Sequence, residues 1–122
     1  MALKDIADAL VAANRNQTEA QLLDEHYAQD AVSVEAAAQG DMPREAKGLD
    51  AIRAKHAWWN ENMEMTGGSV SEPMLHGDDR FAVIYEASGR EKATGETFEM
   101  KEIAVYHVAD DKIVREEFFY SM

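Results

Sequence analysis

The chain contains the segment YAQDAVSVE at residues 27–35 and the segment GLDAIR at residues 48–53, and these two give its strongest structural signal. We expect a helix to end at the start of the first segment, a short strand to follow, and Glu35 to lie at the end of that strand. A loop at 36–47 then leads to a helix that begins just after Gly48. This order predicts a helix-covered sheet with a carboxylate at the end of its first strand.

The remaining pattern predicts three helices followed by a run of strands. Apolar residues at helical spacing indicate helices at 3–14, about 19–27 and about 49–63. In the second half, β-branched and aromatic residues separated by short turns indicate strands near 68–76, 80–90, 96–108 and 112–120. Strands joined by such short turns are antiparallel. The sequence therefore predicts a single α+β domain over 1–122, with the helices packed on one face of the sheet.

The composition is that of a soluble globular protein, and it argues against two kinds of partner. The 122 residues are 46% hydrophobic and 30% charged, with a formal net charge of −12. Nucleic acids and anionic membranes are negatively charged and bind proteins through Lys and Arg. A chain with a net charge of −12 would be repelled by both, so we expect neither as a partner. No apolar run approaches the ~20 residues that a membrane-spanning helix needs. The N-terminal residues lack a signal-peptide pattern and the chain has no cysteine, so we expect a cytoplasmic protein.

The order of these elements resembles the nuclear transport factor 2-like superfamily, and within it the SnoaL-like group of polyketide cyclases and relatives of ketosteroid isomerase. The motifs that carry the resemblance are YAQDA from Tyr27, GLDAIR from Gly48, and the C-terminal run from Asp110 to Tyr120. The resemblance implies a cone-shaped, strongly curved and mostly antiparallel sheet around three helices, a cystatin-like fold with a pocket at its open end. It also implies a homodimer through the convex sheet face. The fold hosts many unrelated functions, so it does not name a reaction.

The resemblance to ketosteroid isomerase places a general base at Glu35 but provides no matching oxyanion donors. That enzyme binds its oxyanion with a tyrosine and a protonated aspartic acid. The matching positions here fall on Leu10 or Val11 and near Ala104. In polyketide cyclase relatives an aspartate ends the last strand, and the position here is about Ser121. We therefore expect neither named activity to transfer.

Three glutamates are candidate site residues. A carboxylate such as Glu35, partly buried at a pocket rim, is suited to proton transfer, although a solvated strand-end glutamate is an equal alternative. Alternation places Glu102 on one strand face with Ala104 and Tyr106, toward the pocket unless a bulge changes the parity. If the face that carries Glu116 also points inward, three carboxylates approach one cavity and at least one stays protonated. We expect one of the latter two to pair with an arginine or to lie at the mouth.

A histidine and several aromatic residues complete the candidate set. His56 lies on the same predicted helix face as Trp59, and the resemblance places it in a pocket hydrogen-bond network, as an acid, a base or an orienting partner. The alternative is a core histidine. Aromatic residues at helix and strand spacing either line an apolar ligand site or simply fill the core. They are Trp58, Trp59, Tyr85, Tyr106, Phe118 and Tyr120.

The sequence contains no recognisable metal or cofactor motif, so we expect neither a metal ion nor a cofactor. The favoured interpretation is a pocket for a small apolar organic molecule. The reaction would be a cofactor-free isomerisation, cyclisation or dehydration. Glu35 would be the base, with His56 and one of Glu102 or Glu116 as proton relay or orienting group. The open alternative is a non-catalytic ligand-binding or dimerisation module, in which Glu35 lies in solvent or in a salt bridge.

Overall fold

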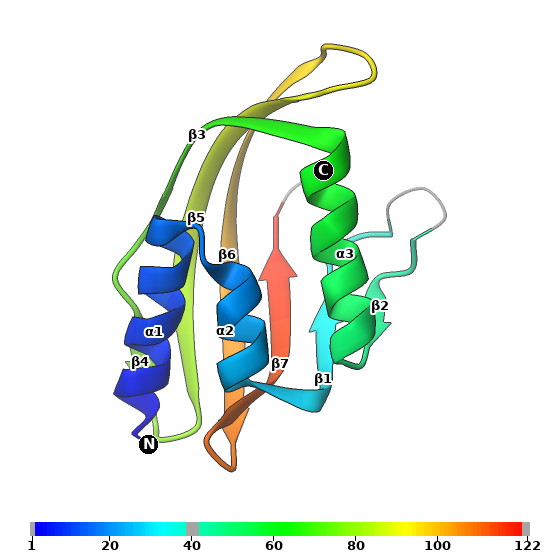
Figure 1. Cartoon of the computed structure of the whole chain (residues 1–122). Helices are drawn as coiled ribbons and strands as arrows, with labels where there is room; N and C mark the ends of the chain where they lie inside the picture. Colours follow the sequence, from blue (N-terminus) through cyan, green and yellow to red (C-terminus); the bar gives the residue numbers. More distant parts are fainter. Residues whose placement is uncertain (1, 39–41, 121–122) are drawn as a thin grey trace.

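The computed structural model describes residues 2–38 and 42–120, and these form three helices in front of an open, curved sheet (Figure 1). The helices are α1 (Leu3–Asn16), α2 (Glu19–His26) and α3 (Leu49–Asn62). The strands are β1 (Tyr27–Val34), β2 (Glu45–Lys47), β3 (Met63–Val70), β4 (Met74–His76), β5 (Arg80–Glu91), β6 (Thr97–Ala109) and β7 (Lys112–Phe119). Their order is β2-β1-β7-β6-β5-β3, with β4 paired to β5. The β1–β7 pair is parallel and the other pairs are antiparallel, which confirms the predicted fold class.

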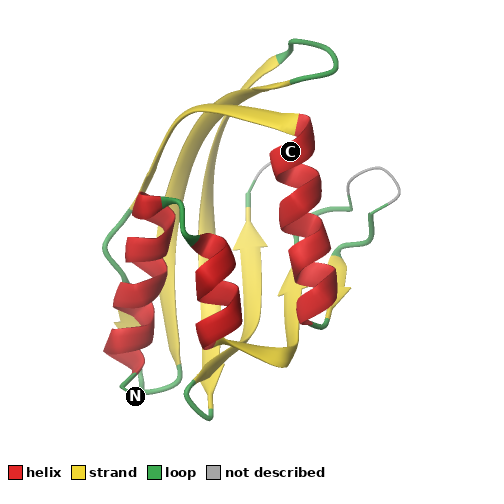
Figure 2. Ribbon diagram, viewed as in Figure 1, coloured by secondary structure: helices red, strands yellow, loops and turns green. Residues whose placement is uncertain are grey.

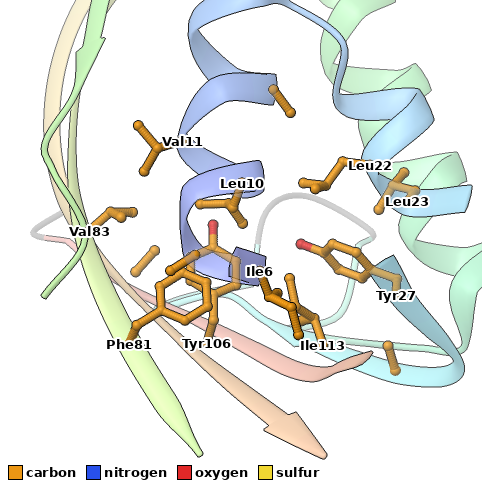
Figure 3. Packing of buried hydrophobic residues seen from close by; sticks show 14 of the residues in the cluster. Ile6, Leu10, Val11, Leu22, Leu23, Tyr27, Phe81, Val83, Tyr106 and Ile113 are labelled. Atoms are coloured by element: carbon orange, nitrogen blue, oxygen red, sulfur yellow. The ribbon is translucent and has the colours of Figure 1, made fainter. Parts of the chain in front are cut away.

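The three helices cover one face of the sheet and bury their apolar sides against it (Figure 2). In α1, Ile6 and Leu10 are a helical turn apart and almost fully buried. They belong to a core that includes Phe81 and Tyr106, whose rings stack with centroids 5.0 Å apart (Figure 3). Burying a side chain of this size stabilises a fold by roughly 1.5–3 kcal/mol. The core also includes Leu49 and Ile52 of α3, so all three helices contribute to it.

The predicted strand at 68–76 is wrong, because the structure has two strands there. β3 begins at Met63 directly after α3, and Gly67 and Gly68 lie inside it, paired with β5. The break falls before Pro73, which has no N–H to donate to a sheet. There Ser71 bonds to Ile84 twice, since its N–H donates to the carbonyl and its Oγ accepts from the Ile84 N–H at 2.8 Å. The glycines looked like a turn in sequence, but they are part of the ladder.

Smaller differences concern the first half of the chain. The first strand is longer than predicted, because it starts at Tyr27 directly after α2. Glu45–Lys47, which fell in the predicted loop 36–47, pairs with β1 as the short strand β2. The helix predicted at 3–14 extends to Asn16. None of the helices within 2–38 and 42–120 is long and apolar enough to cross a membrane.

Candidate functional site

The strand register brings the candidate side chains from four strands to the concave, helix-covered face. Ser33 on β1 lies opposite Glu116 on β7, and Glu116 lies opposite Tyr106 on β6. Four residues before Tyr106 on β6, Glu102 lies opposite Tyr85 on β5. Because side chains alternate along a strand, Glu102 shares its face with the buried Tyr106. The predicted strand parity therefore places Glu102 and Glu116 on the side that faces the helices.

Glu116 is a buried carboxylate, with 2% of its surface exposed. The Tyr27 hydroxyl donates a hydrogen bond to one of its oxygens, and Ser33 Oγ donates to the other at 2.8 Å. Burial raises the pKa of Tyr27 well above its ordinary value, and the nearby charge of Glu116 raises it further. Tyr27 therefore stays a neutral donor. Hydrogen bonds to a charged acceptor are stronger than neutral ones, so these two contacts offset part of the cost of burying Glu116.

Lys55 on α3 connects this buried carboxylate to Glu35. Its Nζ donates to Ser33 Oγ at 2.7 Å and forms an ion pair with Glu35 Oε1 at 2.5 Å. It also lies 4.9 Å from the centroid of the Phe118 ring, at cation–π distance. The Lys55 side chain is only 18% exposed. Ser33, which donates to Glu116 and accepts from Lys55, joins the two ionic groups into one network.

Glu35 follows the last residue of β1, as the sequence predicted. Its backbone N–H donates to the carbonyl of Arg44 at 2.8 Å, which fixes the end of the strand. The carboxylate is held on both sides, by Lys55 at Oε1 and by the Tyr120 hydroxyl, which donates to Oε2 at 3.0 Å. With 20% of its side chain exposed, Glu35 is neither solvated nor unpaired.

Glu102 is the carboxyl group of this cluster that has no hydrogen bond or ion pair within 2–38 and 42–120. Burial raises its pKa from 4.5 to about 7. The charge of Glu35 raises this pKa further, Lys55 lowers it, and Glu116 raises it. The expectation that one of three converging carboxyls is held near its protonated form agrees with this value. The prediction that Glu102 or Glu116 pairs with an arginine is wrong, because the cation in the cluster is Lys55.

A second polar group lies beside Glu102. The hydroxyls of Tyr85 and Tyr106 are 2.7 Å apart, and Asn14 Nδ2 on α1 donates to the Tyr85 hydroxyl at 3.2 Å. Burial raises the pKa of both tyrosines. Both phenols are therefore neutral near pH 7 and able to donate hydrogen bonds.

Two hollows lie along β6, one between α3 and the first residues of β6 and the other over β6 and β7. The α3–β6 hollow has a volume of about 510 Å³. Its walls include Trp59, Met63, Phe98, Met100 and Tyr120. The β6–β7 hollow has a volume of about 390 Å³ and lies on the convex face, since its walls include Ile84, Ile103 and Phe119. Glu102 and Tyr120 also border it. Tyr120 borders both hollows and donates to Glu35, and Met100 in the wall of the α3–β6 hollow shares its face of β6 with Glu102.

The comparison with known families agrees with this architecture. The family model described as a SnoaL-like domain matches residues 1–120. The chain belongs to the SnoaL-like family. No match is found among the curated proteins.

Solved structures extend the similarity. A candidate SnoaL-like polyketide cyclase from Mesorhizobium loti is 36% identical, with a TM-score of 0.90 over 98% of this chain and 100% of its own. An NTF2-like protein from Burkholderia thailandensis is 21% identical, with a TM-score of 0.82 over 99% of this chain and 92% of its own. A protein from Catenulispora acidiphila with a ketosteroid isomerase-like fold, in complex with trimethylamine, is 18% identical with a TM-score of 0.74. It covers 96% of this chain and 85% of its own. The last two similarities show the fold alone.

In this SnoaL-like chain, the positions matched to the hydrogen-bond donors of the isomerase carry apolar side chains. Leu10, Val11 and Ala104 are at most 4% exposed and belong to the core. Ser121, matched to the cyclase aspartate, lies outside the described residues. Neither set of donors is therefore present among the described residues at those positions.

The predicted histidine and aromatic residues occupy different surroundings. His56 is partly buried on α3, and its imidazole forms no hydrogen bond or ion pair with the rest of the described chain. Trp59 packs edge-on against Phe98, with centroids 5.8 Å apart, at the α3–β6 hollow. Trp58 is 37% exposed. Within the part of the chain that the structure describes, no three His, Asp or Glu side chains are grouped to hold a metal ion.

Sequence analysis missed Tyr27, Ser33 and Lys55. A signal for two of them was available. Ser33 precedes Glu35 by two residues, so it shares the strand face of the predicted base. Lys55 lies three residues after the buried Ile52, which puts it on the core-facing side of the helix. Tyr27 had no such signal, because its partner Glu116 is 89 residues away.

Proposed function

We propose that this SnoaL-like protein binds a small, mostly apolar organic molecule at the α3–β6 hollow and transfers a proton on it without a cofactor. The proposal rests on Glu102, which lacks a protein partner among the described residues and shares its face of β6 with Met100, a wall residue of the α3–β6 hollow. Its pKa of about 7 suits a group that both accepts and returns a proton near neutral pH. The walls of the hollow combine apolar residues such as Trp59 and Phe98 with charged ones such as Lys101, and small-molecule sites likewise combine apolar surface with polar groups that orient the ligand.

Glu35 takes a different part in this proposal from the one the sequence favoured. Its two carboxylate oxygens are engaged by Lys55 and Tyr120, so abstracting a substrate proton would require breaking one of these contacts. We therefore assign the proton transfer to Glu102, and to Glu35 the positioning of Lys55 and Tyr120. A role for His56 stays a prediction.

The substrate class follows from the groups that the site offers. A carboxylate with a pKa near 7 removes a proton from carbon only when the carbon acid is activated, and a neighbouring carbonyl provides such activation. We therefore expect a small ketone or ester with a hydrogen on the carbon next to its carbonyl. Isomerisation, aldol-type cyclisation and dehydration all begin with this step.

The test is exchange of the hydrogens next to the carbonyl for deuterium in D2O, followed by proton NMR on a panel of cyclic and aromatic ketones that includes 2-tetralone. We expect the protein to accelerate exchange, and Glu102→Gln to lower the rate by about 10²–10⁴-fold because an amide cannot accept the proton. The matched control is Glu61→Gln, an exposed glutamate near the end of α3 that lines neither hollow, which should keep the rate. An unchanged rate in Glu102→Gln would refute the assignment. A loss confined to Glu35→Gln would move the base to Glu35.

The non-catalytic alternative has its own supporting observation. The Glu35 carboxylate is tied up by a 2.5 Å ion pair and by Tyr120, which is what a binding module predicts. In that case 2-tetralone would quench the fluorescence of Trp59 on binding, while its hydrogens would exchange no faster than without protein. Acceleration that Glu102→Gln removes would exclude this alternative.

We also propose that two copies pair through the convex sheet face. Ile84, Ile103 and Phe119 lie side by side across β5, β6 and β7, and the last two are each 48% exposed. Lys101 with Glu86 and Arg115 with Glu117 add paired charges of both signs, which suits a self-complementary interface. Light scattering should give twice 13.6 kDa, and Ile103→Glu should return the monomer mass. A monomer mass for the unchanged chain at micromolar concentration would refute the dimer.

A further inference from the structure

The hydrogen-bond pattern around Tyr85 fixes the direction in which its hydroxyl donates. Tyr106 is 2% exposed, and within residues 2–38 and 42–120 its hydroxyl has one polar contact, the Tyr85 hydroxyl at 2.7 Å. A buried O–H without an acceptor costs about 1–3 kcal/mol. The Tyr106 hydroxyl avoids this cost only by donating to the Tyr85 oxygen. Tyr85 is therefore the acceptor in that pair.

Asn14 occupies the second acceptor position of the same oxygen. Its Nδ2 donates to the Leu10 carbonyl at 2.9 Å and to the Tyr85 hydroxyl at 3.2 Å, which uses both hydrogens of the amide. The Leu10 contact also fixes the orientation of the amide, because a carbonyl oxygen only accepts. A hydroxyl has two lone pairs and one hydrogen. With both lone pairs of Tyr85 occupied, its hydrogen has no acceptor in the described chain.

The free hydrogen lies next to Glu102. Tyr85 and Glu102 are directly opposite in the β5–β6 register and share the concave face, where such pairs have Cβ atoms about 4.5–5.5 Å apart. Unlike Tyr106, Tyr85 is only partly buried. The strand pair therefore presents a hydrogen-bond donor and a carboxyl group side by side to whatever occupies this face.

We propose that Tyr85 donates its hydroxyl hydrogen to the carbonyl oxygen of the ligand, beside Glu102. This inference rests on the proposed function and adds to it a residue that holds the ligand. The donor lies on β5, whereas the positions matched to isomerase donors, on α1 and near Ala104, are apolar here. Asn14 and Tyr106 are positioning residues, because they act on the ligand only through Tyr85.

The arrangement places a base, Glu102, at the carbon that loses the proton, and a hydrogen-bond donor, Tyr85, at the carbonyl oxygen. The Glu102 carboxylate takes the proton from the carbon next to the carbonyl, and the C–H electron pair becomes a C=C bond. The π electrons of the C=O bond move to oxygen, which becomes an enolate oxygen that accepts the Tyr85 hydrogen bond. Return of the proton from Glu102 to carbon restores the carbonyl and the carboxylate. Since three carboxyl groups disfavour a new negative charge nearby, a donor at the oxygen is what this step requires.

The test uses the infrared carbonyl stretch of bound 2-tetralone labelled with ¹³C at the carbonyl. A hydrogen bond to a carbonyl oxygen lowers this frequency, so we expect a lowered frequency in the unchanged protein and its return toward the apolar-solvent value in Tyr85→Phe. The exchange rate should fall about 10²–10³-fold in the same variant. Tyr27→Phe is the matched control, because it removes a buried hydroxyl that donates to Glu116 and leaves the Tyr85 hydrogen in place. It should keep most of the lowered frequency.

The outcomes separate this inference from the proposed function. An equal carbonyl frequency in Tyr85→Phe and the unchanged protein overturns the role of Tyr85, while loss of exchange in Glu102→Gln still supports proton transfer. No exchange with any ketone overturns the proposed reaction, while a frequency that depends on Tyr85 still supports the donor. If the bound carbonyl of the unchanged protein has the apolar-solvent frequency, or no ketone binds, the donor assignment is wrong. Tyr85→Phe deletes one oxygen atom, and its circular dichroism spectrum establishes that the variant is folded.

Discussion

Replacing Glu102 by Gln should make the protein more stable at alkaline than at acidic pH, relative to the unchanged chain. Burial raises the pKa of Glu102 from 4.5 to about 7 in the folded protein. The folded state therefore holds the proton more tightly than the unfolded chain. The stability linked to this proton is complete below about pH 4.5 and is lost as the pH rises to about 7. Gln keeps the shape of the side chain but cannot ionise, so the variant escapes this loss.

The expected magnitude follows from the pKa. One pKa unit corresponds to about 1.4 kcal/mol, so the rise to about 7 corresponds to about 3 kcal/mol. Glu102 retains some solvent contact, which lowers the expected effect to about 2 kcal/mol. Any constant effect of the amide on packing cancels when the two proteins are compared at two pH values.

The assay is urea unfolding at about pH 5 and about pH 8, with the free energy of unfolding taken from the midpoint and slope. We expect the advantage of Glu102→Gln to grow by about 2 kcal/mol between these values. The control is Glu99→Gln, which makes the same chemical change at an exposed position of the same strand. If Glu102→Gln and the unchanged protein follow parallel stability curves, Glu102 does not titrate near neutrality, and the case for it as the acid–base group fails.

Three further variants probe the same network and the sheet. Lys55→Met removes the charge that lowers the Glu102 pKa, so the pH profile of ketone exchange should move to higher pH, and an unmoved profile would contradict this. Tyr27→Phe removes a hydroxyl donor to the buried Glu116 and should lower the free energy of unfolding in urea by about 1–3 kcal/mol. Gly89→Ala would place a Cβ 2.5 Å from a carbonyl oxygen of β3 and should cost about 1–3 kcal/mol in the same assay. An effect below about 0.5 kcal/mol for either would count against the contact.

The fold could be predicted because its signals are local. Apolar spacing gave the helices, and the period of two along β6 gave the face of Glu102 from its neighbours Ala104 and Tyr106. The errors occur where a local signal has two physical causes. Gly67 and Gly68 indicate a turn, but glycine also occurs in a ladder where another backbone comes close. A Cβ on Gly68 would be 3.2 Å from a β5 carbonyl oxygen.

The partners within the site could not be predicted, because they depend on long-range register. One of Glu102 and Glu116 was expected to pair with an arginine or to lie at the mouth, but Glu116 is held by Tyr27 and Ser33, which come 89 and 83 residues earlier. These contacts exist because β1 pairs in parallel with β7, at the register that places Ser33 opposite Glu116. The residue types along one strand do not determine that register. The sequence therefore located the carboxylates but did not identify the residues that bind them.

Lys55 is the residue that gives the three carboxyl groups different properties. It follows the buried Ile52 by three residues and His56 follows by four, so helical spacing allows either to face the site. The opposite wall decides between them, because Glu35 and Ser33 offer acceptors that suit an ammonium group. Once Lys55 is committed to Glu35, no cation remains within bonding distance of Glu102 in the described chain. Proton-transfer sites are built by such differences between titratable neighbours, and here burial of Glu102 and the commitment of Lys55 to Glu35 create the difference together.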